Sequence, residues 1–174
     1  MCLAWHEIRD QLTASSTTFN FQRGFDAIRR SQAPLKPYRD PASLLDALHR
    51  KTCDGDAKNR ILVALIEAAQ ADDPSADTAL TFLLLALWPG LDAIRRRSIW
   101  RKLGTIDEIA SDVLARTVDV LRSLDLGRVN WVAATVLRNV ERDMIRARNR
   151  ETGRAKLSSD IAPDQVRPEQ CPCH

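Results

Sequence analysis

VNWVAATVLRNVERDMIRARNRE, residues 129–151, decides the fold, because it predicts one amphipathic helix with an apolar face and a basic face. At about 100° per residue, the first face holds Ala133, Leu137, Val140, Met144 and Ala147. The opposite face holds Trp131, Thr135, Arg138, Arg142, Arg146 and Asn149. Guanidinium groups neutralise phosphates or pair with base edges, and an indole stacks on an unpaired base. The stretch therefore indicates either a nucleic-acid contact or a solvated arginine face over a core helix.

The charge of the chain is concentrated around this helix. The 174 residues, 44% of them hydrophobic, suit one domain of ordinary size or a domain with an appendage, and the net charge is only +3. Residues 128–156 hold eight basic and three acidic side chains, a balance of +5, so the rest of the chain is at −2. A positive field confined to one segment indicates a polyanionic partner that binds there.

Several functional classes are disfavoured by the sequence. The four cysteines lack the spacing of a disulfide framework, which favours a cytoplasmic chain with reduced thiols. Cys171, Cys173 and His174 could hold part of a metal site, but no matching pair of ligands stands elsewhere in the sequence, so we expect neither a metal nor a cofactor. The apolar run 79–88 is too short to span a bilayer and ends at Pro89. The first residues do not show a basic leader followed by an apolar core, so we do not expect secretion. No catalytic triad, carboxylate pair or phosphate loop is present, so we predict no enzymatic activity.

Helical periodicity dominates the chain and strand signals are almost absent, so the predicted fold class is all-α, a helical bundle. In the N-terminal part we expect a helix over 2–12 and then a loose stretch over 13–41 with at most one helical turn near 25–30. A helix should follow from the Asp40-Pro41 cap to residue 51. Another helix is expected over 56–71. The last of these should turn Ile61, Leu62, Leu65, Ile66 and Ala69 inward. The other tryptophans, Trp5, Trp88 and Trp100, are expected in the core.

Two further helices are expected before the basic one. The first runs over 79–103 and is bent or broken at Pro89-Gly90, and the second runs over 107–124 after a capping turn at 104–107. The inward face of the second helix is predicted to hold Ile106, Ala110, Val113, Leu114, Thr117, Leu121 and Leu124. Its outer face carries Glu108, Asp112, Arg116, Asp119 and Arg122. After a short loop over 125–128 the basic helix follows, and no useful helix is expected beyond Leu157.

This order of helices resembles the second conserved region of bacterial sigma factors, the promoter-specificity subunits of RNA polymerase. The closest likeness is to the small extracytoplasmic-function type. Leu84–Arg97, with its internal proline, is similar to the opening helix of that region, and Asp107–Asp125 is similar to the helix that binds core polymerase. The family signature W-x7-N-x3-D-x2-R is matched by Trp131, Asn139, Asp143 and Arg146.

The resemblance implies a region 2-like domain over residues 76–157, a helical extension of unknown role over 1–75, and a flexible tail over 158–174. It also implies core RNA polymerase and promoter DNA as partners. The implied polymerase-binding residues are Glu108, Asp112, Arg116, Asp119 and Arg122. The implied DNA-binding residues are Arg128, Asn130, Trp131, Thr135, Arg138, Arg142 and Arg146.

Within the DNA-binding set, the resemblance assigns separate roles. Trp131 matches the first of two aromatics that open the upstream edge of the −10 element, and Thr135 and Arg138 face the base pair at that edge. The loop Leu126–Asn130 lies where the family captures a flipped-out base, whose unstacking costs a few kcal/mol. Two residues depart from the pattern, because Val132 replaces the second aromatic and Arg128 replaces an earlier one.

The chain ends where a linker and a helix-turn-helix that reads the −35 element are expected, so we expect a second protein, an activator or an extended −10 sequence to supply the missing contact. The alternative is a sigma-like adaptor or anti-activator that binds polymerase or another regulator without reading bases. A polymerase-independent DNA-binding protein is a third reading. Two pairs of these residues also have a purely structural interpretation. Asn139 and Asp143 could form a buried polar pair that fixes helix packing, and Asp112 and Arg116 could form a solvated ion pair.

Overall fold

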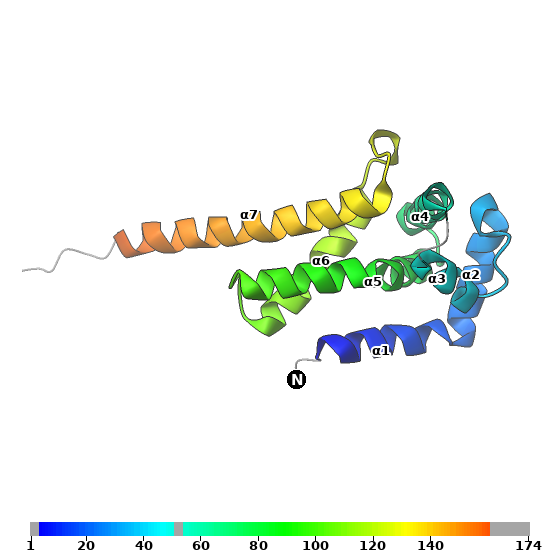
Figure 1. Cartoon of the computed structure of the whole chain (residues 1–174), viewed down its shortest axis with the longest axis horizontal. Coiled ribbons are helices and arrows are strands. Elements are labelled where there is room, and N and C mark those ends of the chain that lie inside the picture. Colours follow the sequence, from blue (N-terminus) through cyan, green and yellow to red (C-terminus); the bar gives the residue numbers. More distant parts are fainter. Residues whose placement is uncertain (1–3, 51–53, 161–174) are drawn as a thin grey trace, which may run out of the picture.

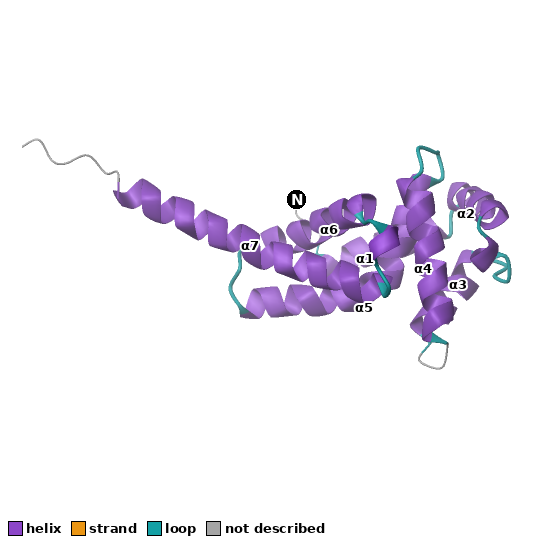
Figure 2. Cartoon of the chain, turned by 90° about the horizontal axis from the view of Figure 1, so that it is seen from above, coloured by secondary structure: helices purple, strands orange, loops and turns teal. Residues whose placement is uncertain are grey.

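In the computed structural model, which describes residues 4–50 and 54–160, every regular element is a helix (Figures 1 and 2). The α-helices are α1 Trp5–Ser16, α2 Phe19–Ser31, α3 Pro41–His49, α4 Gly55–Gln70, α5 Ala76–Trp100, α6 Ile106–Ser123 and α7 Val132–Asp160. Short 3₁₀ helices, η1 Ala33–Leu35 and η2 Leu126–Arg128, lie between them. The all-α prediction is therefore confirmed for the described residues.

Helix α5 is the centre of the bundle, and all the other α-helices contact it. Helix α4 packs on α5, α6 and α7, so one hydrophobic core runs across residue 75. The expected division into an extension and a region 2-like domain stays a prediction, but the two parts share that core. Helix α7 lies along α5 and α6 and then continues alone beyond them (Figure 1).

Of the two outcomes predicted at Pro89-Gly90, a bend or a break, the break does not occur, because α5 continues through Pro89. A proline cannot donate a hydrogen bond to the carbonyl four residues earlier, here that of Leu85. The Nε2 atom of His49, at the end of α3, lies 3.2 Å from the Leu85 oxygen and 3.3 Å from the Ala86 oxygen. With its proton on Nε2, His49 satisfies the carbonyl that Pro89 leaves free, and the helix continues.

Because α5 does not end at Pro89, it is long and apolar enough to cross a membrane by length and composition alone. The expectation that the apolar run ends at Pro89 and is too short to span a bilayer is therefore wrong. Half of its most apolar window is buried inside the bundle. The core helix of a folded bundle meets the same criteria, so this single helix is weak evidence for a membrane span.

Residues 13–41, expected to be a loose stretch with at most one helical turn, contain the 13-residue helix α2, so this prediction is wrong. The Thr18 hydroxyl accepts a hydrogen bond from the Phe21 backbone N–H and so caps the helix. Phe21 and Phe25 then stack on Phe82 of α5, with ring centroids 5.6 and 5.7 Å apart. Gly24 favours a loop in the sequence, but in the structure it allows α2 to approach α5 closely, since a Cβ there would lie 2.9 Å from the Thr78 Cβ.

We predict that Gly24→Ala lowers the free energy of unfolding by about 1 kcal/mol, although alanine is the better helix former by about 1 kcal/mol. The reason is that overpacking against β-branched Thr78 costs about 1–3 kcal/mol. In a Thr78→Ala background the same change should be stabilising. Urea unfolding of the two single variants and the double variant measures both effects. Stabilisation by Gly24→Ala in the wild-type background would contradict this packing argument.

The ends and faces of the last helices differ in detail from expectation. Thr105 caps α6, as the predicted capping turn requires, and the Glu108 side chain returns a hydrogen bond to the Thr105 backbone. Ile106 is 62% exposed rather than inward. Val132 and Val136 are buried, so the inward face of α7 is wider than the predicted one. Trp100, predicted to be a core residue, is 82% exposed at the end of α5.

Helix α7 also begins and ends later than expected. It starts at Val132 rather than at residue 129, and it continues to Asp160, past the predicted limit at Leu157. Residues 148–155 of α7 are exposed and lie outside the hydrophobic core, so this part of the helix depends on its own backbone hydrogen bonds. The C-terminal Cys171, Cys173 and His174 lie outside the described residues.

Candidate nucleic-acid interface

Trp131 lies directly before α7 and is 55% exposed. The loop that precedes it is ordered by Asp125, whose carboxylate accepts a hydrogen bond from the Gly127 N–H and pairs with the Arg128 guanidinium at 3.2 Å. Arg128 and Asn130 are both exposed on this loop. The three residues therefore present two polar side chains and one indole at the start of α7.

A residue that the sequence reading did not single out holds Trp131 in place. Asn59 of α4 donates from Nδ2 to the Asn130 carbonyl at 2.8 Å, and its Oδ1 accepts from the Val132 N–H at 2.9 Å. A helix leaves its first N–H groups without intrahelical partners, so Asn59 caps α7 from a different helix. Because its two hydrogen bonds are made on either side of Trp131, the carboxamide fixes the backbone that carries the indole.

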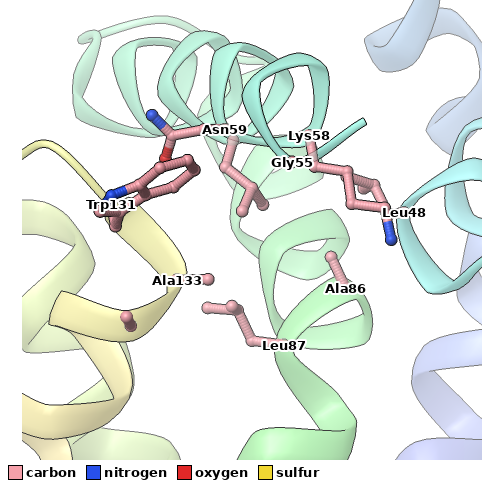
Figure 3. Close-up of a pocket in the computed structure, with 10 residues that line it drawn as sticks. Leu48, Gly55, Lys58, Asn59, Ala86, Leu87, Trp131 and Ala133 are labelled. Atoms are coloured by element: carbon pink, nitrogen blue, oxygen red, sulfur yellow. The ribbon is translucent and has the colours of Figure 1, made fainter. Parts of the chain in front are cut away.

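Beside Trp131 lies an apolar pocket of about 320 Å³ (Figure 3). It is lined by Leu48, Gly55, Lys58, Asn59, Leu62, Ala86, Leu87, Trp131, Ala133 and Ala134. Trp131 and Asn59 are on one side, and Leu48 of α3 is on the opposite side (Figure 3). Three of its walls come from α3, α4 and α5, so residues far apart in sequence meet at this indole. No local pattern indicates this, because the contacts span about seventy residues.

Behind Trp131, the arginines of α7 form an exposed row that we call the basic face: Arg138, Arg142 and Arg146. Among the side chains described, those of residues 4–50 and 54–155, no carboxylate lies at ion-pair distance from any of them. Thr135, predicted on the same face, is half-buried. The structure thus places Trp131 directly before α7, at the head of the exposed arginine row that the periodicity predicts on this helix.

The predicted pairing of Asn139 with Asp143 is not made, since the described hydrogen bonds include none between them. Both side chains are half-buried. Instead, the Arg142 guanidinium donates to the Asn139 Oδ1 atom at 2.9 Å. This contact holds Arg142 along the surface of α7 and leaves it within reach of a ligand.

A charged clamp fixes the middle of α7 to the end of α5. Arg97 makes two hydrogen bonds of 2.9 Å to the Glu141 carboxylate, and Arg101 makes one of 3.1 Å. The hydrogen bonds from Arg97, with smaller contributions from the charges of Arg97 and Arg101, hold the pKa of Glu141 below its ordinary value of 4.5. The clamp therefore adds a charged contact between α7 and the end of α5, beside the buried apolar face of α7.

We predict that Glu141→Gln lowers the free energy of unfolding at neutral pH by about 1 kcal/mol, a modest value because Arg97 is nearly half-exposed and screened by solvent. Since the folded-state pKa of Glu141 is depressed, its contribution is complete above the unfolded pKa near 4.5 and is lost as the pH falls through the lower folded value. The free energies of unfolding of wild type and variant should therefore converge as the pH falls, and urea unfolding at several pH values measures this. Glu151→Gln, which alters an exposed pair at 3.6 Å, is the control. A difference that persists undiminished below the folded pKa would contradict the clamp.

The predicted polymerase-binding residues lie along α6. The Glu108 carboxylate caps the helix, and the hydrogen bonds from Thr105 lower its pKa. Asp112 and Arg116 form an ion pair at 3.4 Å, in which Arg116 is only 25% exposed. Asp119 and Arg122 are exposed. This face of α6 is therefore charged and accessible. The ion pair between Asp112 and Arg116 does not prevent either residue from also contacting a partner.

Within the described residues, no group of three histidine, cysteine, aspartate or glutamate side chains could hold a metal ion. Comparison with models of protein families, with curated proteins and with solved structures finds no match to this chain.

Proposed function

We propose that this chain is a sigma-factor-like regulator of transcription initiation that acts in the cytoplasm and binds core RNA polymerase and the −10 element of promoters. The observation that carries the proposal is the position of Trp131, half-exposed at the head of the basic face and clamped by Asn59. The family signature residues that follow it, Asn139, Asp143 and Arg146, lie on the same helix.

The chemistry of this arrangement suits partly melted DNA. The exposed guanidiniums of the basic face neutralise phosphates, and the indole offers a stacking surface to a base that leaves the duplex. Taking a base out of the stack costs a few kcal/mol, which stacking on a fixed aromatic partly offsets. Because Asn59 and Glu141 fix both the indole and the helix, little ordering entropy is lost on binding.

The charged face of α6 is the proposed polymerase contact, and a second protein that reads the −35 element is the proposed partner. Electrostatic complementarity at an exposed face raises the association rate and selects the partner more than it adds affinity. Asp112 and Arg116 are the proposed centre of this contact, since they are its least exposed charged pair.

The decisive experiment is co-purification of the full chain with core polymerase at modest salt. We expect retention of the wild type, and we expect the double variant Asp112→Ala, Arg116→Ala to be lost from the complex while keeping its thermal stability. Glu67→Ala, a change on α4 away from this face, is the matched control. Equal recovery of wild type and of an unrelated protein of the same charge would exclude the proposal.

One observation favours the adaptor as the second candidate. Val132, which replaces the second aromatic of the family, is 1% exposed, so this position contributes nothing to a melting surface. If Trp131→Ala and Asn130→Ala leave promoter output intact while Asp112→Ala abolishes it, the protein binds polymerase without reading bases.

A further inference from the structure

We infer that a second cavity, between α1, α5 and the start of α6, binds a small organic acid with an apolar body and one carboxylate. The inference goes beyond the proposed function, because it requires neither polymerase nor nucleic acid. It also gives a role to α1, which lies within the N-terminal residues of unknown role.

The lining of this cavity suits the apolar body of such a ligand. Its volume of about 690 Å³ is within the range of small-molecule sites. Helix α1 packs on α5 beside it (Figure 1). Three helices supply its apolar lining: Trp5 of α1, Trp88 and Pro89 of α5, and Ile106 and Ala110 of α6. Ile106 is 62% exposed, so an apolar group bound here would remove its side chain from water.

Two buried N–H donors of this lining lack an acceptor. Neither the Nε1 atom of Trp5 nor the Nε atom of Arg95 has a hydrogen-bond partner among the described residues. The two side chains are neighbours, because the Arg95 guanidinium lies over the Trp5 ring, 5.3 Å from its centroid. Trp5 also stacks on Trp88, with ring centroids 4.3 Å apart. Buried donors are nearly always paired in folded proteins, so this corner of the cavity is suited to a ligand that brings acceptor oxygens.

The charges of the cavity favour an anion with a single charge. Its lining holds three arginines, Arg9, Arg95 and Arg96, and two aspartates, Asp92 and Asp107, a balance of +1 with the histidine of the lining counted as neutral. The Asp92 carboxylate pairs with Arg95 at 3.3 Å and with Arg96 at 2.8 Å. Guanidinium groups bind a carboxylate through short, charge-assisted hydrogen bonds. A monocarboxylate would therefore complete the balance, whereas a polyanion such as DNA would be repelled by both aspartates.

The first experiment compares 2-naphthoate with its neutral isostere 2-naphthamide on the full chain. Each of the four tryptophans gives one indole N–H signal in a ¹H–¹⁵N spectrum, and Trp100→Phe and Trp131→Phe assign the two exposed ones. Millimolar naphthoate should shift the two remaining signals, those of Trp5 and Trp88, to saturation. Naphthamide should bind about tenfold more weakly, because it cannot form the charge-assisted contact.

The second experiment removes cations from the rim of the cavity. Arg9 and Arg96 are exposed there, so the double variant Arg9→Gln, Arg96→Gln should keep its thermal stability. It should bind naphthoate about tenfold more weakly, with naphthamide binding unchanged. Arg60→Gln, at an exposed position of α4 outside this lining, is the matched control and should bind naphthoate as the wild type does.

Three outcomes would overturn the inference: no saturable shift of the Trp5 and Trp88 signals, equal affinity for naphthoate and naphthamide, or unchanged naphthoate affinity of the double variant. Polymerase and DNA are absent from both experiments. Failure here is therefore distinct from failure of the co-purification that tests the proposed function.

Discussion

Changing Asn59 to alanine is expected to lower the free energy of unfolding by about 2 kcal/mol and to release Trp131. The change removes both hydrogen bonds that hold residues 130–132 and leaves the Val132 N–H without its partner beside a buried side chain. An unsatisfied buried donor costs about 1–3 kcal/mol. Chemical denaturation measures the loss, and ¹⁹F NMR with 5-fluorotryptophan reports the environment of Trp131 separately from the other three indoles.

Asn59→Asp separates the two hydrogen bonds. The aspartate can still accept from the Val132 N–H at the start of α7, where a negative charge is favourable, but it cannot donate to the Asn130 carbonyl. Its stability should therefore be intermediate. Asn20→Ala, at an exposed position on α2, is the control and should match wild type. A ¹⁹F signal of Trp131 that is unchanged in Asn59→Ala would show that the indole is held by other contacts.

Local signals in the sequence account for much of the fold. The Asp40-Pro41 pair begins α3, with the Asp40 carboxylate accepting from the Ser43 N–H, as the cap predicts. All five residues predicted to face inward on α4 are buried. On α7 the arginines are exposed and Val140, Met144 and Ala147 are buried, so a period of 3.6 residues separates the two faces correctly.

The errors arise where a distant helix decides the outcome. The sequence predicts a loop at Gly24, but this glycine lies where α2 packs closely on Thr78 of α5. The sequence also predicts a disturbed helix at Pro89, but His49 of α3 binds the Leu85 carbonyl that the proline leaves free. Asn59 has no local feature that marks it, because its partners are about seventy residues away. The same holds for the candidate site. The basic face follows from the helical periodicity of the sequence, whereas the pocket beside Trp131 and the charged clamp at Glu141 depend on tertiary packing.

The second large effect concerns the division of roles along the basic face. Arg142 and Arg146 are one turn apart and further from Trp131, where phosphates would follow the helix. Replacing either with alanine should weaken binding about equally on all DNA sequences and lower the salt slope by about one unit. Arg138 lies nearer to Trp131, where the resemblance places base contacts. Arg138→Ala should instead relax the preference at one base pair and cost about 1–3 kcal/mol against the cognate site.

Titrations of each variant on a cognate and a randomised −10 fragment, with polymerase present and at several salt concentrations, separate these outcomes. Arg150→Ala, beyond the signature residues on α7, is a control for a general loss of positive charge. A base-reading arginine changes the ratio of the two affinities, whereas a phosphate-binding arginine changes both by the same factor. If Arg138→Ala loses affinity uniformly, as Arg142→Ala should, then α7 acts only as an electrostatic clamp, and any sequence preference must come from Trp131 and the loop before it.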